Sequence, residues 1–422
     1  MKSLRILTLA DSGIGGTEKA ATIYACGLKQ AGHFVVYSGE KGPRTAELEL
    51  NEIPVVTAAR TPSAMREMIL DIKPDIIHQH IPGYPCNNPI YDALVGMSQR
   101  PKLIQTNVFG WLSEKRAIEM VDFHLFISRA SGSQAFRRAG LKLNQEWLRK
   151  CSVVMYPLPQ SKQVDPEFRR EYRKQRGISD DTYLAIRVGR PSMGKWTDWE
   201  CKALLHAVEL GAKVKLLIIE PPAALLPRLQ KAIDRNLIII EKATADFDLL
   251  NAYYSAADCM LHASLFGESF GYTLAEGMAA GLPVITRSTP WGDSAQVELV
   301  ENGVTGHVCA TTQEMGRRLF DLARGAATAK EMGKAGKQRI EELSDSEREI
   351  NLLEKILIHL TTGSAQTAIE QRNNEFLSFH EQLPQREKAY SDTRRPLLEL
   401  VHWNCYKAYR ELRAWLRVNL KQ

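Results

Sequence analysis

The stretch that decides the fold runs from Leu261 to Thr286 and reads LHASLFGESFGYTLAEGMAAGLPVIT. Apolar residues at helical spacing between Leu274 and Ala279 predict a helix that begins near Tyr272. Gly281 suits the left-handed position after a helix, and Pro283 prevents the helix from continuing. The β-branched residues that follow predict a buried strand of a parallel sheet. The stretch therefore predicts a loop, a helix and a strand, as in an α/β fold.

The start of this predicted helix suits an anion. Free backbone N–H groups near Gly271, Tyr272 and Thr273, with the positive end of the helix dipole, favour a phosphate. Glu268 and Glu276 flank this position, and a carboxylate accepts two hydrogen bonds from a vicinal diol. An anion position between two diol acceptors indicates a nucleotide-sugar site. The alternative is that Glu276 only stabilises the first turn of the helix.

The whole run, with its glycine turn, Phe270, short helix and buried strand, resembles the E-x7-E signature of retaining GT-B glycosyltransferases of family four. These are the glycosyl transferases of group 1. The resemblance implies two Rossmann-like domains that face each other across a cleft. It also implies that Glu276 holds the ribose of the donor and Glu268 the hydroxyls of the transferred sugar. The donor-binding residues implied in this stretch are Phe270, Gly271, Tyr272, Thr273 and Glu276.

The composition is typical of a soluble globular protein, with 44% hydrophobic and 25% charged residues in a chain of 422. No apolar run approaches the roughly 20 residues that span a bilayer. The apolar start is not expected to be a signal peptide, because Asp11 interrupts it and no small-residue cleavage site follows. Seven scattered cysteines without a CxxC pair argue for reduced thiols and against a zinc site. We therefore expect a cytoplasmic protein.

Residues 4–38 predict a strand, a glycine-rich turn, a helix and a second strand, which is a βαβ opening. Gly13-x-Gly15 lacks the third glycine of a dinucleotide fingerprint, because Glu18 stands at that position. This departure argues against a dehydrogenase. The family resemblance instead implies that the backbone of Gly15 and Gly16 approaches the donor diphosphate from the opposite domain. A tight connection without any ligand is the alternative.

Two further predicted strands, residues 74–80 and 101–107, end in polar residues. Polar residues at the carboxyl ends of parallel strands line the crevice where ligands bind. The first segment resembles the family's PDVVHAH stretch, which implies that His80 lies near the acceptor or the transferred sugar. A structural role for His80 is the alternative. In the second segment Asn107 stands where many relatives carry histidine, so no ionisable group is expected there.

Residues 160–181 are dense in charge and predict the linker between the domains. A strand from Tyr183 to Val188 then leads into a segment that resembles the family's VGR…KG element. Its cations, Arg190 and Lys195, are implied to hold the diphosphate, since arginine grips phosphate oxygens bidentately and lysine acts as a mobile charge. Two surface cations on a loop are the alternative.

The segment that begins at Lys242 corresponds to the one through which relatives hold the nucleotide base, so Lys242 is an expected donor-binding residue. The pair Asp246-x-Asp248 could suggest a metal site of a different glycosyltransferase architecture. It opens a predicted helix, however, and a helix cap explains it better. We therefore expect no metal.

The end of the sequence predicts a helix from Pro396 onwards with a basic and an aromatic-rich apolar face. The basic face holds Lys407, Arg410, Arg413, Arg417 and Lys421, and the apolar face holds Ala408, Tyr409, Leu412, Trp415 and Leu416. One interpretation is an interfacial helix that binds an anionic membrane surface through residues 396–422, on the inner face of the membrane. The other is a helix packed on the first domain. No second basic cluster supports nucleic-acid binding.

Together these patterns predict an α/β protein of GT-B architecture in three parts. Residues 1–163 form the N-terminal Rossmann-like, acceptor-side domain. Residues 164–360 form the C-terminal Rossmann-like, nucleotide-sugar-binding domain, and residues 361–422 form a helical, basic, amphipathic tail.

The resemblance implies transfer of a sugar from a UDP-, GDP- or ADP-sugar to a glycan or lipid-linked acceptor, with retention of the anomeric configuration. No metal ion and no cofactor are expected to take part. The implied process is the synthesis of cell-surface polysaccharide or lipopolysaccharide. The implied catalytic residues are Glu268, Arg190, Lys195 and His80. A nucleotide-sugar epimerase of the same fold, and a non-catalytic membrane-associated relative, are the alternatives. The base, the sugar and the acceptor stay open.

Overall fold

The computed structural model describes residues 3–13, 15–57, 59–83, 88–112, 115–158, 165–191, 195–242, 244, 246–290, 292–364 and 367–389. The chain divides into two compact units, each with its own parallel sheet. Among the described residues, the first unit holds 3–157 and 346–383, and the second holds 158–345 and 384–389. The prediction of an α/β protein with two Rossmann-like domains is confirmed.

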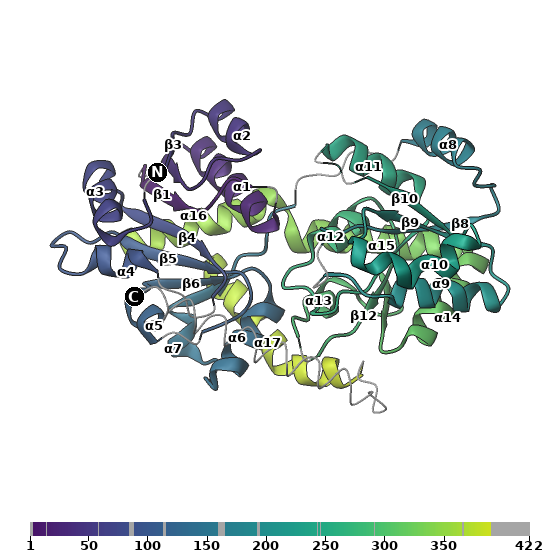
Figure 1. Cartoon of the computed structure of the whole chain (residues 1–422). Coiled ribbons are helices and arrows are strands. Elements are labelled where there is room, and N and C mark those ends of the chain that lie inside the picture. Colours follow the sequence, from purple (N-terminus) through teal and green to yellow (C-terminus); the bar gives the residue numbers. More distant parts are fainter. Residues whose placement is uncertain are drawn as a thin grey trace. The chain divides into compact units, whose positions relative to one another are not determined.

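The sheet of the first unit has the strand order β3-β2-β1-β4-β5-β6-β7 (Figure 1). The strand β1 pairs in parallel with β2 on one side and with β4 on the other. Its strands are β1 (Arg5–Leu9), β2 (Phe34–Ser38), β3 (Val55–Val56), β4 (Ile76–Ile81), β5 (Lys102–Asn107), β6 (Phe123–Phe126) and β7 (Cys151–Val153). Its helices are α1 (Gly16–Gln30), α2 (Thr45–Leu50), α3 (Pro62–Ile72), α4 (Pro89–Leu94), α5 (Lys115–Met120), α6 (Arg129–Ala139), α7 (Gln145–Leu148), α16 (Ser346–Thr362) and α17 (Thr367–Ala389), of which α17 continues into the second unit.

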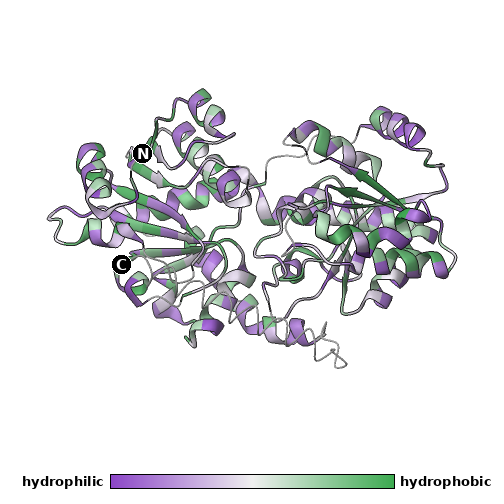
Figure 2. Cartoon of the chain, viewed as in Figure 1, coloured by the Kyte–Doolittle hydropathy of each residue, from purple (hydrophilic) through white to green (hydrophobic). Residues whose placement is uncertain are grey.

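The sheet of the second unit has the strand order β10-β9-β8-β11-β12-β13, again all parallel. Its strands are β8 (Tyr183–Arg187), β9 (Val214–Ile219), β10 (Ile238–Glu241), β11 (Cys259–His262), β12 (Val284–Arg287) and β13 (Gly306–Cys309). Its helices are α8 (Pro166–Gln175), α9 (Trp199–Glu209), α10 (Leu226–Asp234), α11 (Phe247–Ala256), α12 (Tyr272–Ala279), α13 (Gln296–Leu299), α14 (Thr312–Arg324) and α15 (Ala326–Ser344), with a 3-10 turn at Ala223–Leu225. Figure 2 shows these strands mainly as hydrophobic, as expected when helices cover both faces of a sheet.

The stretch that decides the fold forms the predicted loop, helix and strand. The helix α12 begins at Tyr272 and the strand β12 begins at Val284. Gly281 follows the helix with a φ of 79°, and the Leu282 N–H donates to the Gly277 carbonyl at 3.0 Å. This is the left-handed helix end that the glycine predicts.

The prediction of a linker at residues 160–181 is wrong where the structure describes that segment. The helix α8 lies there, with Asp165 as its cap and Pro166 in its first turn. Its charged residues are not simply solvated, because the Arg173 side chain is buried and pairs with Asp258 at 3.2 Å. The charge density that suggested a linker is therefore part of the packing of the second unit.

The end expected for the second domain at residue 360 also differs from the structure. The helix α16 packs on the first unit, where Glu354 lies 3.1 Å from His33 Nε2. The segment predicted as a separate helical tail begins with α17, which belongs mainly to the first unit. The Phe376 side chain of α17 is fully buried, with its ring 6.1 Å from that of Phe126. Contacts distant in sequence therefore assign these helices to the first unit.

In the described part of the chain, no helix is both long and apolar enough to cross a membrane. The basic tail helix predicted from residue 396 onwards lies outside the described residues.

Candidate functional site

The sheet of the second unit reverses its strand order between β8 and β11. The chain runs from β8 outward to β9 and β10 on one side, and then returns to add β11 beside β8. In open α/β sheets, ligands bind beyond the carboxyl ends of the strands at such a switch point. Two loops leave the sheet there: the β8 loop, of which the structure describes residues 188–191 and 195–196, and the β11 loop, residues 263–271. Both carry residues predicted for the site.

The structure brings Lys195 of the β8 loop and Glu268 of the β11 loop into direct contact. The Lys195 ammonium donates to Glu268 Oε2 at 2.8 Å and lies 3.3 Å from the Gly267 carbonyl oxygen. The other carboxylate oxygen, Oε1, lies 3.3 Å from His262 Nε2 at the end of β11. Glu268 is 8% exposed, so both contacts lie in a largely desolvated position.

The charges of this cluster follow from burial and neighbours. Burial alone would raise the pKa of Glu268, but the Lys195 ammonium and the His262 hydrogen bond outweigh it and hold that pKa well below its usual range. Burial lowers the pKa of His262 to about 4, and the Arg187 charge acts in the same direction. His262 is therefore neutral near pH 7, and we assign its proton to Nε2, which donates to Glu268. The site holds one carboxylate between a cation and a neutral donor.

The backbone of Glu268 is fixed as firmly as its side chain. Its N–H donates to Gln296 Oε1 at 3.2 Å, and its carbonyl accepts the Ala295 N–H at 2.8 Å. Gly267 has a φ of 73°, and a Cβ at this position would overlap the Asp293 carbonyl oxygen. Only glycine fits there. The loop therefore presents the Glu268 carboxylate in a single, supported position.

The start of α12 has the geometry expected of an anion position. Gly271 is the N-cap residue of the helix, with a φ of 94°, and as a glycine it has no side chain to cap the first turn. Tyr272 and Thr273, in that turn, are half-buried, whereas the Phe270 ring is buried and meets the Tyr272 ring edge-on at 5.0 Å. Phe270 thus shapes the loop from within rather than lining its surface.

Glu276 lies one turn into α12 and is half-buried. Its Oε2 accepts a hydrogen bond from the Tyr254 hydroxyl at 3.2 Å. Tyr254 lies on α11 and is fully buried, so its hydroxyl holds the Glu276 carboxylate in one orientation. Glu276 and Glu268 therefore have separate supports, a tyrosine for one and a lysine–histidine pair for the other.

The remaining residues predicted in the second unit are exposed or serve as caps. The Arg190 and Lys242 side chains are exposed, and that of Arg190 forms no hydrogen bond or ion pair with other described residues. Asp246 caps α11, its Oδ1 accepting the N–H groups of Asp248 at 2.8 Å and Leu249 at 3.2 Å. The interpretation of this pair as a helix cap is confirmed.

In the first unit, the predicted residues also lie at the switch point of their sheet, between β1 and β4. Gly15 is the N-cap residue of α1 and Gly16 is its first residue, and a Cβ at Gly15 would overlap the Glu18 carboxylate. His80 lies near the end of β4, with its ring 4.6 Å from that of His78. Both ring nitrogens of His80 are shielded from solvent and have no partner among the described residues. Burial and the neighbouring His78 hold its pKa well below 6.5.

Comparison with known families decides the identity of the second unit. The family model described as Glycosyl transferases group 1 matches residues 183–324, which span β8 to α14. Residues 183–324 form a group 1 glycosyltransferase domain. They include both loops of the switch point and the cluster of Lys195, Glu268 and His262. The chain is accordingly a glycosyltransferase, although a comparison with curated protein sequences finds no significant match.

The fold of the whole glycosyltransferase is similar to that of several solved structures, all of low identity. A glycosyltransferase from Rickettsia africae ESF-5 has a TM-score of 0.70 at 15% identity, over 86% of this chain and all of its own. HepE from Anabaena, in complex with UDP-glucose, has a TM-score of 0.65 at 18% identity, over 84% of this chain and 99% of its own. WaaG, a glycosyltransferase involved in lipopolysaccharide biosynthesis, has a TM-score of 0.60 at 15% identity, over 85% of this chain and all of its own. These likenesses establish the GT-B fold.

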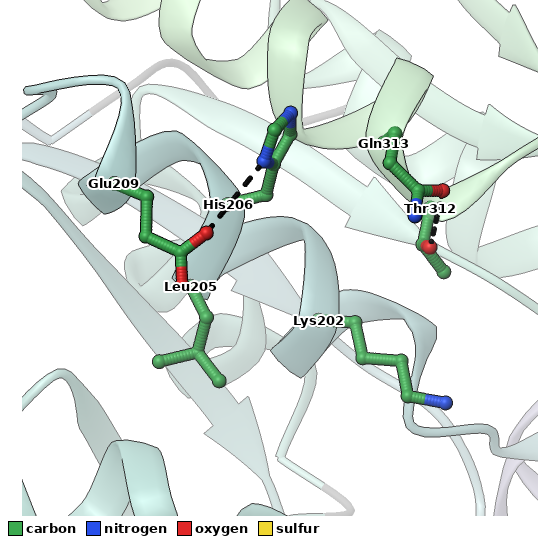
Figure 3. A pocket seen from close by; sticks show the side chains of 6 residues that line it. All are labelled: Lys202, Leu205, His206, Glu209, Thr312 and Gln313. Atoms are coloured by element: carbon green, nitrogen blue, oxygen red, sulfur yellow. Dashed lines mark hydrogen bonds and ion pairs between the residues drawn. The ribbon is translucent and has the colours of Figure 1, made fainter.

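A surface hollow of about 260 Å³ in the glycosyltransferase domain lies away from this set of residues (Figure 3). It lies between α9 and the start of α14, and its lining residues are Lys202, Leu205, His206, Glu209, Thr312 and Gln313. The His206 and Glu209 side chains point toward each other, with 3.8 Å between Nδ1 and Oε2. The hollow includes none of the predicted site residues. The chemistry of the β8 and β11 loops therefore identifies the site better than the shape of this surface does.

Sequence reasoning missed several residues that build the site, above all His262 and Gln296. His262 ends a strand with a polar side chain, which is the signal that drew attention to His80. Applying that rule to β11 would have found it. Gln296 had no comparable signal, since it reaches the Glu268 backbone from α13, 28 residues further along the chain.

Proposed function

We propose that this glycosyltransferase moves a sugar from a nucleotide-diphosphate sugar to a glycan or lipid-linked acceptor, with retention of the anomeric configuration and without a metal ion. The observation that carries the proposal is the contact of Lys195, Glu268 and His262 at the switch point of the matched domain. In this contact a lysine ammonium lies beside a buried carboxylate, near a helix whose N-cap residue is Gly271.

We infer that the positive groups stabilise the negative charge that the reaction develops. As the glycosidic bond to the diphosphate breaks, the leaving group gains charge, and fixed donors aimed at that charge lower the barrier. Lys195, Arg190 and the N–H groups at the start of α12 supply these donors. Since Arg190 is exposed and unpaired among the described residues, it can turn to the phosphate without breaking an existing bond.

The two carboxylates divide the donor between them. Glu268 is ionised, and we propose that it accepts hydrogen bonds from hydroxyls of the transferred sugar. Glu276, oriented by the Tyr254 hydroxyl, accepts those of the ribose. The Lys195 ammonium, 2.8 Å from Glu268, then lies between the sugar and the diphosphate.

His80 is proposed to contact the acceptor or the transferred sugar. Its low pKa keeps the ring neutral near pH 7, so one ring nitrogen donates and the other accepts. Neither nitrogen has a partner among the described residues, but both are shielded from solvent, so this contact requires a movement that exposes the ring.

Lys195→Ala is expected to weaken binding of the nucleoside diphosphate by about 10- to 150-fold, because a charge-assisted hydrogen bond is worth roughly 1.5–3 kcal/mol. Titration calorimetry measures this directly. Lys202→Ala is a matched control, since Lys202 lies on α9 beside the hollow of Figure 3 and pairs with Asp198. An unchanged affinity of Lys195→Ala would remove Lys195 from the site.

The stereochemical and metal aspects of the proposal are tested together. The protein is incubated with UDP-, GDP- and ADP-sugars and glycan acceptors, and the anomeric proton of the product is followed by NMR with and without EDTA. We expect a product of unchanged configuration and a rate that EDTA does not alter. Inversion, or a loss of activity that manganese restores, would contradict the proposal. Conversion of the donor sugar in the absence of any acceptor would instead favour an epimerase.

We further propose that the acceptor belongs to cell-surface polysaccharide or lipopolysaccharide synthesis and that residues 396–422 bind an anionic membrane surface. The support is the sequence pattern of five basic residues on one predicted helix face with Trp415 opposite.

Truncation after Asp392 is expected to abolish binding to anionic vesicles while leaving nucleotide affinity unchanged. The full-length protein should bind vesicles of anionic lipid more weakly as salt rises, because screening reduces the attraction. Vesicle flotation at two salt concentrations, with neutral lipid as the control, measures both effects. Truncation that lowers the melting temperature of a protein that never bound vesicles would show that the tail is a structural strap.

A further inference from the structure

The β8 and β11 loops meet at a buried ion pair that the proposed chemistry does not use. Arg187 is the last residue of β8, and Glu200 lies in the first turn of α9. Arg187 Nε donates to Glu200 Oε1 at 2.6 Å, and the two side chains are only 1% and 4% exposed. Neither residue reaches solvent, so neither is available to contact a substrate.

Arg187 fastens both ends of the β8 loop. One terminal nitrogen donates to the Val188 carbonyl, at the start of the loop, and the other donates to the Lys195 carbonyl, near its end. The guanidinium lies 4.4 Å from the centre of the Trp196 ring, and the Trp196 indole N–H donates to the Arg190 carbonyl at 2.7 Å. The backbone positions of Arg190 and Lys195 are thus set by Arg187 and Trp196.

Glu200 fastens the β11 loop. Its Oε1 also accepts the backbone N–H of Ala263, the first residue of that loop, at 2.8 Å. Its Oε2 accepts the Thr197 hydroxyl at 3.3 Å, and the same hydroxyl lies 3.4 Å from the Ala263 carbonyl. The Glu200 carboxylate therefore contacts both loops. It binds Ala263 at the start of the β11 loop directly, and it binds the β8 loop through Arg187.

Stability alone does not explain this arrangement. Removing two charges from water costs several kcal/mol per ion, and well-packed apolar residues in place of a buried pair are often neutral or stabilising. Arg187 also faces a glycine, since a Cβ at Gly189 would lie 3.0 Å from its terminal nitrogen. The planar Arg187 guanidinium donates to three separate acceptors and so fixes their positions relative to one another, which apolar packing does not do.

We propose that Arg187 and Glu200 are positioning residues. They hold the β8 and β11 loops in the relative position that brings the Lys195 ammonium into contact with the Glu268 carboxylate. This inference rests on the proposed function for its kinetic consequence, but its structural content is independent of the substrate. Arg187 acts through the carbonyls of Val188 and Lys195, and Glu200 acts through the N–H of Ala263.

The test compares three variants of the full chain. Arg187→Met removes the fork and keeps most of the side-chain volume, and Arg187→Lys keeps the charge beside Glu200 but has one nitrogen for three acceptors. Arg173→Met is the matched control, because Arg173 is also buried in this unit, on α8. It pairs with Asp258 and donates to the Ala256 and Thr182 carbonyls before β11 and β8 begin, away from the loops.

We expect Arg187→Met and Arg187→Lys alike to lower kcat by about 100-fold, the loss that a displacement near 1 Å produces. Nucleoside diphosphate affinity should fall about 10-fold, and amide hydrogen exchange should rise in residues 188–190, 195–197 and 263–271. Arg173→Met should lower the melting temperature without any of these changes. If Arg187→Lys retains wild-type kcat and exchange, the arginine only neutralises Glu200 and the inference is overturned.

The exchange measurement keeps the two proposals distinguishable. A wild-type protein that binds no nucleoside diphosphate contradicts the proposed function, whereas the exchange of the two loops still decides the role of Arg187. Unchanged exchange in both loops of Arg187→Met overturns the positioning role, whatever the wild-type protein binds.

Discussion

Replacing Glu268 with glutamine is expected to lower kcat by about 100- to 1,000-fold, the range seen when one preorganised polar group is removed from a desolvated site. Glutamine keeps the shape and can still accept the His262 N–H, so the loop should stay in place. What is lost is the negative charge that holds Lys195 and that we propose accepts the sugar hydroxyls. Affinity for the bare nucleoside diphosphate should stay unchanged or rise slightly, because the carboxylate no longer competes for the Lys195 ammonium.

Glu276→Ala is the control for Glu268→Gln, because we expect it to lower the nucleotide affinity that Glu268→Gln leaves intact. Its proposed partner in the donor is the ribose, which the bare nucleotide contains, so this variant should bind the nucleoside diphosphate more weakly. Steady-state kinetics and titration calorimetry on both variants separate the two effects. Equal losses of nucleotide affinity in the two variants would contradict the division of roles.

Glu349→Ala is expected to destabilise the first unit by about 3–5 kcal/mol, the usual cost of leaving a buried charge without its partner. Glu349 of α16 is fully buried, and Arg372 of α17 donates to its two oxygens at 2.7 and 2.9 Å. Its Oε2 also accepts the Met155 N–H at 2.8 Å, just after β7. The substitution leaves the Arg372 guanidinium, which also donates to the Val153 carbonyl, without its carboxylate.

Urea unfolding followed by circular dichroism measures this loss. Glu347→Ala, two residues earlier on α16, is the matched control because Glu347 is exposed and should change the free energy of unfolding by less than about 0.5 kcal/mol. A loss for Glu349→Ala as small as that of the control would show that α16 and α17 are not anchored through this pair.

Most of the architecture could be predicted because local patterns carry it. Glycine turns, apolar periodicity and the helix end at Gly281 identified the strands and helices around both switch points. Side chains at the carboxyl ends of neighbouring parallel strands converge, so the approach of Lys195 to Glu268 follows from the topology.

The assignment of the last helices could not be predicted, since an amphipathic pattern does not say which sheet a helix covers. α16 joins the first unit through contacts such as that of Glu354 with His33, more than 300 residues apart. α8 was hidden because Arg173 is buried, and Arg169 half-buried, against Asp258 and backbone carbonyls, whereas a charge-rich segment usually predicts solvent exposure.

The roles of Arg187 and Glu200 were hidden for a related reason. Each lies in a regular element, and its importance comes from acceptors on two separate loops. No spacing rule along one chain segment indicates such a connection.

The most direct measurement of the central claim is the melting temperature of the full-length protein with UDP, GDP and ADP, each compared with its nucleoside. At 100 times its dissociation constant, the matching diphosphate should raise the melting temperature by about 5–10 °C, since it adds about 2.7 kcal/mol and 1 kcal/mol corresponds to roughly 2–4 °C in a domain of this size. The nucleoside should have a much smaller effect, and Lys195→Ala should lose most of the shift. If none of the three diphosphates raises the melting temperature of the wild-type protein, the β8 and β11 loops do not form a nucleotide-sugar site.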